Sequence, residues 1–188
     1  VAFSSLGALR IKVAKQNDLI DENKWAPLWV VDFPLFEWND GHSRWDSLHH
    51  PFTSPNFEDI DLLDIDPSKV RSLGYDIVMN GYEIGGGSIR IHDKNLQSKI
   101  FNLLGISNEE ANEKFGFLMN AFKYGAPPHG GMAFGFDRLI MLLVGSKQIR
   151  DVIAFPKTTS AMSLMDNSPS AVNSTQLKEL GLSIKNKK

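Results

Sequence analysis

The stretch that decides the fold is YDIVMNGYEIGGGSIR, residues 75–90 of a 188-residue chain. Residues 75–79 are apolar and partly β-branched, which is typical of a strand. Asn80-Gly81 interrupts this run, and the dipeptide suits a turn or a bulge between paired strands. Residues 88–92 predict the next strand. We interpret Gly85-Gly86-Gly87 between them as a glycine turn.

The segments on either side mix helices and strands without a regular alternation. A doubly wound parallel sheet would require that alternation, so we predict an α+β fold in which an antiparallel sheet is flanked by helices. Hydrophobic spacing, a capping box at Ser107 and Glu110, and apolar β-branched runs locate the elements. Helices are predicted at residues 6–13, 96–104, 107–122 and 138–144, and further strands at residues 28–36, 132–136 and 152–155.

Composition excludes several classes of protein. Twelve Phe and four Trp in the chain can bury a large core, which excludes wholesale disorder. The absence of Cys excludes disulfides, thiolate zinc sites and a Cys nucleophile. The longest apolar run, residues 139–144, is far shorter than the roughly 20 residues that span a bilayer, so no membrane partner is expected. Because the chain begins at Val1 in structured sequence, we expect a fragment.

Familiar catalytic motifs are absent. The glycine run fails as Gly-x-Gly-x-x-Gly because Arg90 holds the third glycine position, and no Gly-Lys-Ser/Thr follows any glycine loop. His49-His50 lacks further ligands at zinc spacing. No Gly-x-Ser-x-Gly elbow is present, which disfavours a serine hydrolase.

Two carboxylates stand out in sequence that otherwise reads as core. Asp76 lies within an apolar strand and Glu83 follows seven residues later. Burying an unpaired charge is costly, so such residues need a partner or a metal. Strict alternation places them on opposite faces, but a bulge or turn near Asn80-Gly81 would bring them together. Converging carboxylates suit Mg²⁺, and the alternative is an ion pair for each, for instance with Arg90.

Two arginines point to anion binding. Arg90 follows the glycine run, where the backbone can be approached closely, and a guanidinium there suits a carboxylate or a phosphate. Arg138 opens a predicted helix, although cations are disfavoured at helix N-termini. The alternative for Arg138 is a surface salt bridge on the helix.

Four segments together resemble one protein family. Residues 130–139, GGMAFGFDRL, resemble motif 3 of the class II aminoacyl-tRNA synthetases. Residues 76–90 resemble the strands that precede motif 3 in the aspartyl, asparaginyl and lysyl subgroup. The segments HHPFT (49–53) and RDVIAFPK (150–157) resemble the bacterial-type aspartyl enzymes. The resemblance implies a class II synthetase fold, here as a partial domain.

The resemblance also implies roles for individual residues. His49 and Arg90 would bind L-aspartate, Arg90 through the side-chain carboxylate. Asp76 and Glu83 would hold Mg²⁺ on the ATP phosphates. ATP would contact the residues Glu83, Gly135, Phe136, Asp137 and Arg138, with Arg138 as the catalytic residue on the γ-phosphate.

The same resemblance implies the domain organisation and the reaction. Residues 1–26 would be the tail of the bacterial insertion domain, and residues 27–188 the C-terminal part of the catalytic core. The complete enzyme would be a cytoplasmic homodimer that activates L-aspartate with ATP and transfers it to tRNA. The chain lacks motifs 1 and 2, so we expect it to be inactive alone.

Two alternatives stay open. One is an asparaginyl or lysyl relative, although Arg90 would repel a lysine ammonium. The other is a non-catalytic synthetase paralogue that acts as a binding protein.

Overall fold

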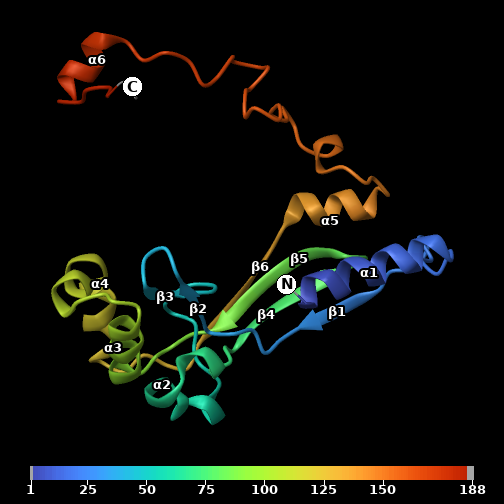
Figure 1. The fold of residues 1–188 in the computed structure, drawn as a ribbon. Coiled ribbons are helices and arrows are strands. Elements are labelled where there is room, and N and C mark those ends of the chain that lie inside the picture. Colours follow the sequence, from blue (N-terminus) through green and yellow to red (C-terminus); the bar gives the residue numbers. More distant parts are fainter. Residues whose placement is uncertain (1, 186–188) are drawn as a thin grey trace. The chain divides into compact units, whose positions relative to one another are not determined.

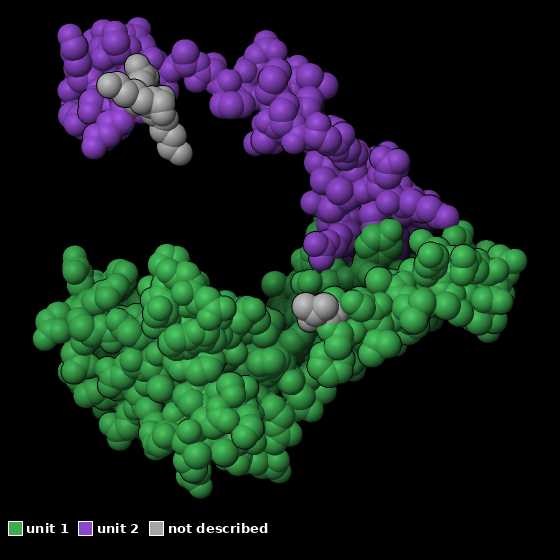
Figure 2. Space-filling view, in the orientation of Figure 1, with its two compact units in different colours: residues 1–136 green, residues 137–188 purple. Residues whose placement is uncertain are grey.

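The computed structural model describes residues 2–185 and divides the chain into two compact units. Unit 1 is Val1–Phe136 and unit 2 is Asp137–Lys188, coloured green and purple in Figure 2. The division falls after Phe136, so the domain boundary between residues 26 and 27 stays a prediction. Within residues 2–185, no helix has the length and apolar character needed to cross a membrane.

The helices and strands mostly follow the sequence prediction, with altered ends. The helices are α1 (Ala2–Gln16), α2 (Leu62–Ile65), α3 (Lys94–Leu103), α4 (Asn108–Phe122), α5 (Phe136–Leu143) and α6 (Ser174–Glu179), and the short 3₁₀ turns are η1 (Phe57–Asp59), η2 (Pro67–Lys69) and η3 (Ile149–Asp151). The strands are β1 (Pro27–Val30), β2 (Phe36–Asn39), β3 (Arg44–Ser47), β4 (Gly74–Met79), β5 (Tyr82–Ile89) and β6 (Gly130–Phe134).

An antiparallel sheet organises unit 1, as predicted. Its strand order is β1-β4-β5-β6, with every pair antiparallel, and β2 and β3 form a separate two-stranded sheet (Figure 1). Beyond β5, a core of seven buried side chains joins β2, α2, η2 and α3: Leu35, Phe36, Leu63, Val70, Ile91, Ile100 and Leu104. Burial of these side chains supplies the hydrophobic stabilisation of this end of unit 1.

Two strand predictions are wrong. Residues 28–36 do not form one strand, because Asp32 adopts a left-handed φ of 58° and Pro34 has no N–H to donate to a sheet. The run is instead divided between β1 and β2. Residues 152–155 follow η3 and contain no strand; Phe155 has a φ of 59°, which ends extended pairing before Pro156.

The glycine run lies inside strand β5, so its interpretation as a turn is wrong. The turn is at Asn80-Gly81, where φ is 51° and 85°. A Cβ added to Gly87 would overlap the carbonyl oxygen of Gly131 and lie 2.9 Å from its carbonyl carbon. The glycines therefore let β5 and β6 approach more closely than side chains would allow.

Side-chain caps begin both helices of this region, and the one predicted at Ser107 is confirmed. Asp93 caps α3 by accepting a 2.7 Å hydrogen bond from Leu96 N, and Gly105 follows the helix with a φ of 75°. Ser107 caps α4 by accepting from Glu110 N at 3.2 Å. These two helices pack beside the end of β5 where the candidate site lies (Figure 1).

Candidate functional site

Arg90 occupies the first position after β5. Its backbone N–H donates to His129 O at 2.9 Å, and Thr53 pairs with it in an antiparallel bridge. The side chain is half-buried. The backbone of Arg90 is thus held on both sides, and the direction of its side chain is fixed by the sheet.

The loop before Pro55 is bonded along the same stretch. Ser54 N donates to Ile89 O, and Ile91 N donates to Phe52 O, each at 2.9 Å. Residues 52–54 therefore act as a further, short strand beside residues 89–91. This pairing brings the His49-His50 segment to Arg90.

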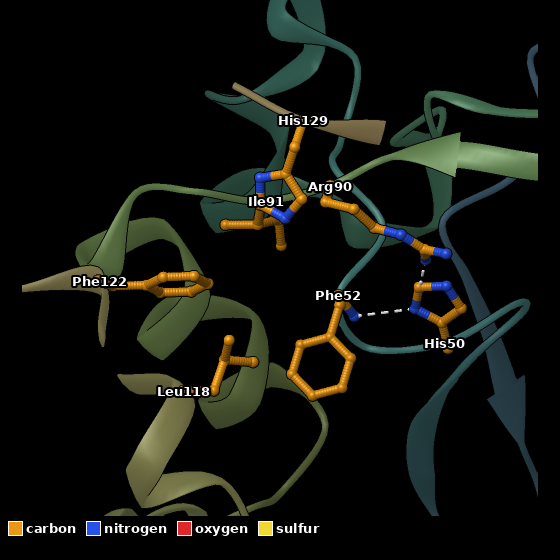
Figure 3. Close-up of a pocket in the computed structure, with 7 residues that line it drawn as sticks. All are labelled: His50, Phe52, Arg90, Ile91, Leu118, Phe122 and His129. Carbon is orange, nitrogen blue, oxygen red and sulfur yellow. Dashed lines mark hydrogen bonds between the residues drawn. The ribbon is translucent and has the colours of Figure 1, made fainter. Parts of the chain in front are cut away.

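A pocket of about 330 Å³ opens at this junction (Figure 3). It is mostly apolar, and Leu118 and Phe122 of α4 form the wall away from the guanidinium. A guanidinium in apolar surroundings favours a planar anion that it can bind with two parallel hydrogen bonds. The lining residues are His50, Phe52, Arg90, Ile91, Leu118, Phe122 and His129.

His50 contacts Arg90 directly. Arg90 Nη1 and His50 Nδ1 lie 3.1 Å apart, and the Phe52 N–H donates to the same Nδ1 at 3.2 Å. Burial, together with the positive charges of Arg90 and His49, lowers the pKa of His50 below its ordinary value. The imidazole beside Arg90 is therefore neutral at physiological pH.

His49, the histidine predicted to bind the substrate, lies elsewhere on the loop. Its ring is exposed and packs edge-on against Phe33, with the ring centroids 4.9 Å apart. A Cβ at Gly74 would come within 3.3 Å of His49 Nε2, so glycine makes room for this ring. The structure thus brings His50 to Arg90, a contact that the sequence analysis missed. Only the pairing between residues 52–54 and 89–91 reveals it.

The two carboxylates share one face of the sheet. Asp76 pairs with Gly86 and Val78 pairs with Glu83, because a register shift leaves Ile84 as an extra residue in β5. A bulge therefore places both carboxylates on one face, although it lies at Ile84 and not at Asn80-Gly81. Asp76 and Glu83 are diagonal neighbours on adjacent strands, a spacing that long side chains can still bridge.

Their burial differs from the sequence expectation. Asp76 is half-buried, whereas Glu83 is exposed. A Cβ at Gly86 would overlap the Asp76 carboxylate, so the glycine leaves the space that this carboxylate fills. In residues 2–185, no group of three or more His, Asp or Glu side chains is arranged to hold a metal. Two carboxylates suit Mg²⁺, which takes its other oxygens from water and phosphate.

The motif 3 residues lie at the boundary between the two units. Gly135 N donates to Ile84 O at 2.9 Å, so it extends the β5–β6 pairing to the bulge. Phe136 ends unit 1 and is 70% exposed. Asp137 and Arg138 are exposed in the first turn of α5 and belong to unit 2.

The chain matches the family described as tRNA synthetases class II (D, K and N) over residues 6–159. It belongs to the class II tRNA synthetases. An aspartate–tRNA(Asp/Asn) ligase of Caldanaerobacter subterraneus subsp. tengcongensis is 61% identical, and an aspartate–tRNA ligase of Staphylococcus carnosus is 57% identical. Each alignment covers 98% of this chain, which spans only about a third of those relatives, 31% and 32%.

Solved structures support the class II fold. The aspartyl-tRNA synthetase of Entamoeba histolytica aligns with a TM-score of 0.54 at 24% identity, over 81% of this chain and 26% of that one. An asparaginyl-tRNA synthetase from the same organism, in complex with asparaginyl-adenylate, has a TM-score of 0.54 over 73% of this chain and 26% of its own. The antiparallel sheet with flanking helices is thus the partial fold of a class II synthetase.

Proposed function

We propose that these 188 residues form the C-terminal part of an aspartate–tRNA ligase. The names of the 57–61% identical relatives support this proposal. The single observation that carries it is the guanidinium of Arg90 in a mostly apolar pocket that no carboxylate of residues 2–185 lines. An arginine there favours a carboxylate side chain, repels the ammonium of lysine and loses a charge-assisted hydrogen bond with the amide of asparagine.

The proposed reaction begins with activation of L-aspartate. Its α-carboxylate attacks the α-phosphorus of ATP, the bond to the bridging oxygen breaks, and pyrophosphate leaves as aspartyl-adenylate forms. The nucleophile is already ionised, so no protein base is needed, and the protein contributes positioning and charge neutralisation. Arg90 holds the side-chain carboxylate, and His49 is proposed to contact the amino acid.

Asp76 and Glu83 are the residues proposed to hold Mg²⁺. When bound, the ion neutralises charge on the phosphates of ATP. Gly135, Phe136, Asp137 and Arg138 are proposed to bind ATP, with Arg138 on the γ-phosphate. Transfer of the aspartyl group to tRNA completes the reaction in a cytoplasmic homodimer.

The experiment uses a chimeric ligase, made by joining residues 1–188 to the upstream segment of the Caldanaerobacter relative. ATP–pyrophosphate exchange is measured with aspartate, asparagine and lysine, followed by charging of tRNA. We expect exchange with aspartate alone. A preference for asparagine or lysine overturns the substrate assignment. No exchange with any amino acid, while the unmodified relative is active, supports a non-catalytic paralogue instead.

A further inference from the structure

We propose that His50 is a positioning residue that turns Arg90 so that its Nε and Nη2 edge faces the substrate carboxylate. This inference rests on the proposed function only in that Arg90 binds a carboxylate. The observation behind it is that His50 Nδ1 lies within hydrogen-bond distance of two donors, the Arg90 guanidinium and the Phe52 backbone.

The Phe52 contact fixes the tautomer of His50. A backbone N–H only donates, so the Nδ1 that receives the 3.2 Å hydrogen bond carries no proton. The same nitrogen is therefore an acceptor for Arg90 Nη1 at 3.1 Å. This hydrogen bond joins a charged donor to a neutral acceptor, and such a bond is stronger than one between two neutral groups.

His50 is held before any ligand arrives. The Phe52 ring packs edge-on against Phe101 and Phe115, with ring centroids 6.0 and 5.2 Å apart. Between His50 and Phe52, the carbonyl of Pro51 accepts a 2.8 Å hydrogen bond from Nε2 of the fully buried Gln97. The acceptor is thus fixed by α3 and α4, and Arg90 does not have to order it.

The charges around His50 also favour the neutral ring. The ionisable groups that face it are Arg90, the preceding His49, and His129 across the pocket, and no carboxylate lines the pocket. His129 is itself oriented, because its Nδ1 donates to Pro127 O at 2.9 Å. A proton on His50 would face cationic or neutral groups and would remove both acceptor contacts.

The arrangement leaves one edge of the guanidinium for a ligand. Nη1 is engaged by His50, and within residues 2–185 no hydrogen bond or ion pair engages Nε or Nη2 of Arg90. Those two N–H groups lie on one side of the planar group and match the two oxygens of a carboxylate. Figure 3 shows the guanidinium turned toward the His50 ring and away from Phe122.

The test compares His50→Asn with His50→Leu in the chimeric ligase. The amide oxygen of Asn can take the place of Nδ1, whereas Leu fills similar space without an acceptor. We expect His50→Leu to raise the KM for aspartate roughly tenfold or more, as for loss of a hydrogen bond from a charged donor, with the KM for ATP within twofold. His50→Asn is expected to stay within about threefold of the parent. His42→Leu, in the exposed turn between β2 and β3, is the matched histidine control.

The pH profile supplies a second readout. The KM of the parent for aspartate should rise as the pH falls through the lowered pKa of His50, and the His50→Asn profile should be flat in that range. Equal losses in the Asn and Leu variants, both folded by circular dichroism, would overturn the positioning role. If Arg90→Gln raises the KM for aspartate but His50→Leu does not, the positioning role of His50 is also overturned, while the proposed function stands. If Arg90→Gln is silent as well, the proposed function itself fails.

Discussion

Gly86 and Gly87 are neighbours in β5, yet a methyl group added to each should have opposite consequences. At Gly87 the new Cβ overlaps Gly131 O and lies 3.0 Å from Met132 Cα, and these atoms are backbone of β6. At Gly86 it overlaps the carboxylate of Asp76 and lies 3.2 Å from Asp76 Cγ. The first obstacle can yield only if the strands separate, whereas the second is the end of a side chain that can rotate.

The magnitudes follow from this difference. Overpacking costs about 1–3 kcal/mol, and we expect Gly87→Ala at the upper end, about 3 kcal/mol, because no side chain can move aside. At Gly86, turning Asp76 off its rotamer costs about 0.5–1.5 kcal/mol. The lower entropy of the unfolded chain returns about 0.4–1 kcal/mol. Gly86→Ala should therefore leave the stability within about 1 kcal/mol of the parent while it displaces a proposed metal ligand.

The assay is urea unfolding of both variants in the chimeric ligase, together with the Mg²⁺ dependence of pyrophosphate exchange. Gly87→Ala should lower the unfolding midpoint. Gly86→Ala should keep the midpoint and raise the Mg²⁺ concentration needed for half-maximal rate. A Gly87→Ala variant as stable as the parent refutes the close-packing argument. Normal Mg²⁺ dependence in Gly86→Ala refutes the placement of Asp76 as a ligand.

Three further outcomes are expected. Arg90→Gln in the chimeric ligase should cost aspartate activation about 2–3 kcal/mol in kcat/KM, and a change of only a few-fold would remove Arg90 from this role. Glu83→Ala should weaken the response to Mg²⁺ with little change in the unfolding midpoint, because the residue is exposed; an unaltered Mg²⁺ titration favours an ion pair instead. The isolated chain should make no aspartyl-adenylate, because it lacks motifs 1 and 2. It should also associate in light scattering, because Trp29, Val31 and Phe134 are more than half exposed; an active monomer contradicts both expectations.

The features that sequence predicts well here are local ones. The strand at residues 75–79, the turn at Asn80-Gly81 and the cap at Ser107 depend on residues close in sequence, and the structure confirms each. The glycine run is not predictable in this way, because its role depends on the backbone of β6, more than 40 residues later, which approaches it closely. A glycine run by itself predicts a turn as readily as a closely packed strand.

The candidate site divides in the same way. Arg90 stands out in sequence because it follows a glycine run, where the backbone can be approached closely, and it does line the pocket. His50 does not stand out, because its contact joins residues 40 positions apart. That contact depends on the bridge between Thr53 and Arg90, which leaves no periodic signal in the sequence. Adjacent histidines in a loop cannot be told apart without this register.

The geometry of β5 also bears on one interpretation of Asp76, that it forms an ion pair with Arg90. If Asp76 were an ion-pair partner of Arg90, the two charges would have to meet. Asp76 instead lies opposite Gly86, four residues from Arg90, which is about 13 Å along a strand. In agreement with this spacing, no ion pair within residues 2–185 joins the two side chains. Asp76 of β4 and Arg90 after β5 are therefore separate charges, which fits the roles proposed for them: a carboxylate for a metal and a guanidinium for an amino acid side chain.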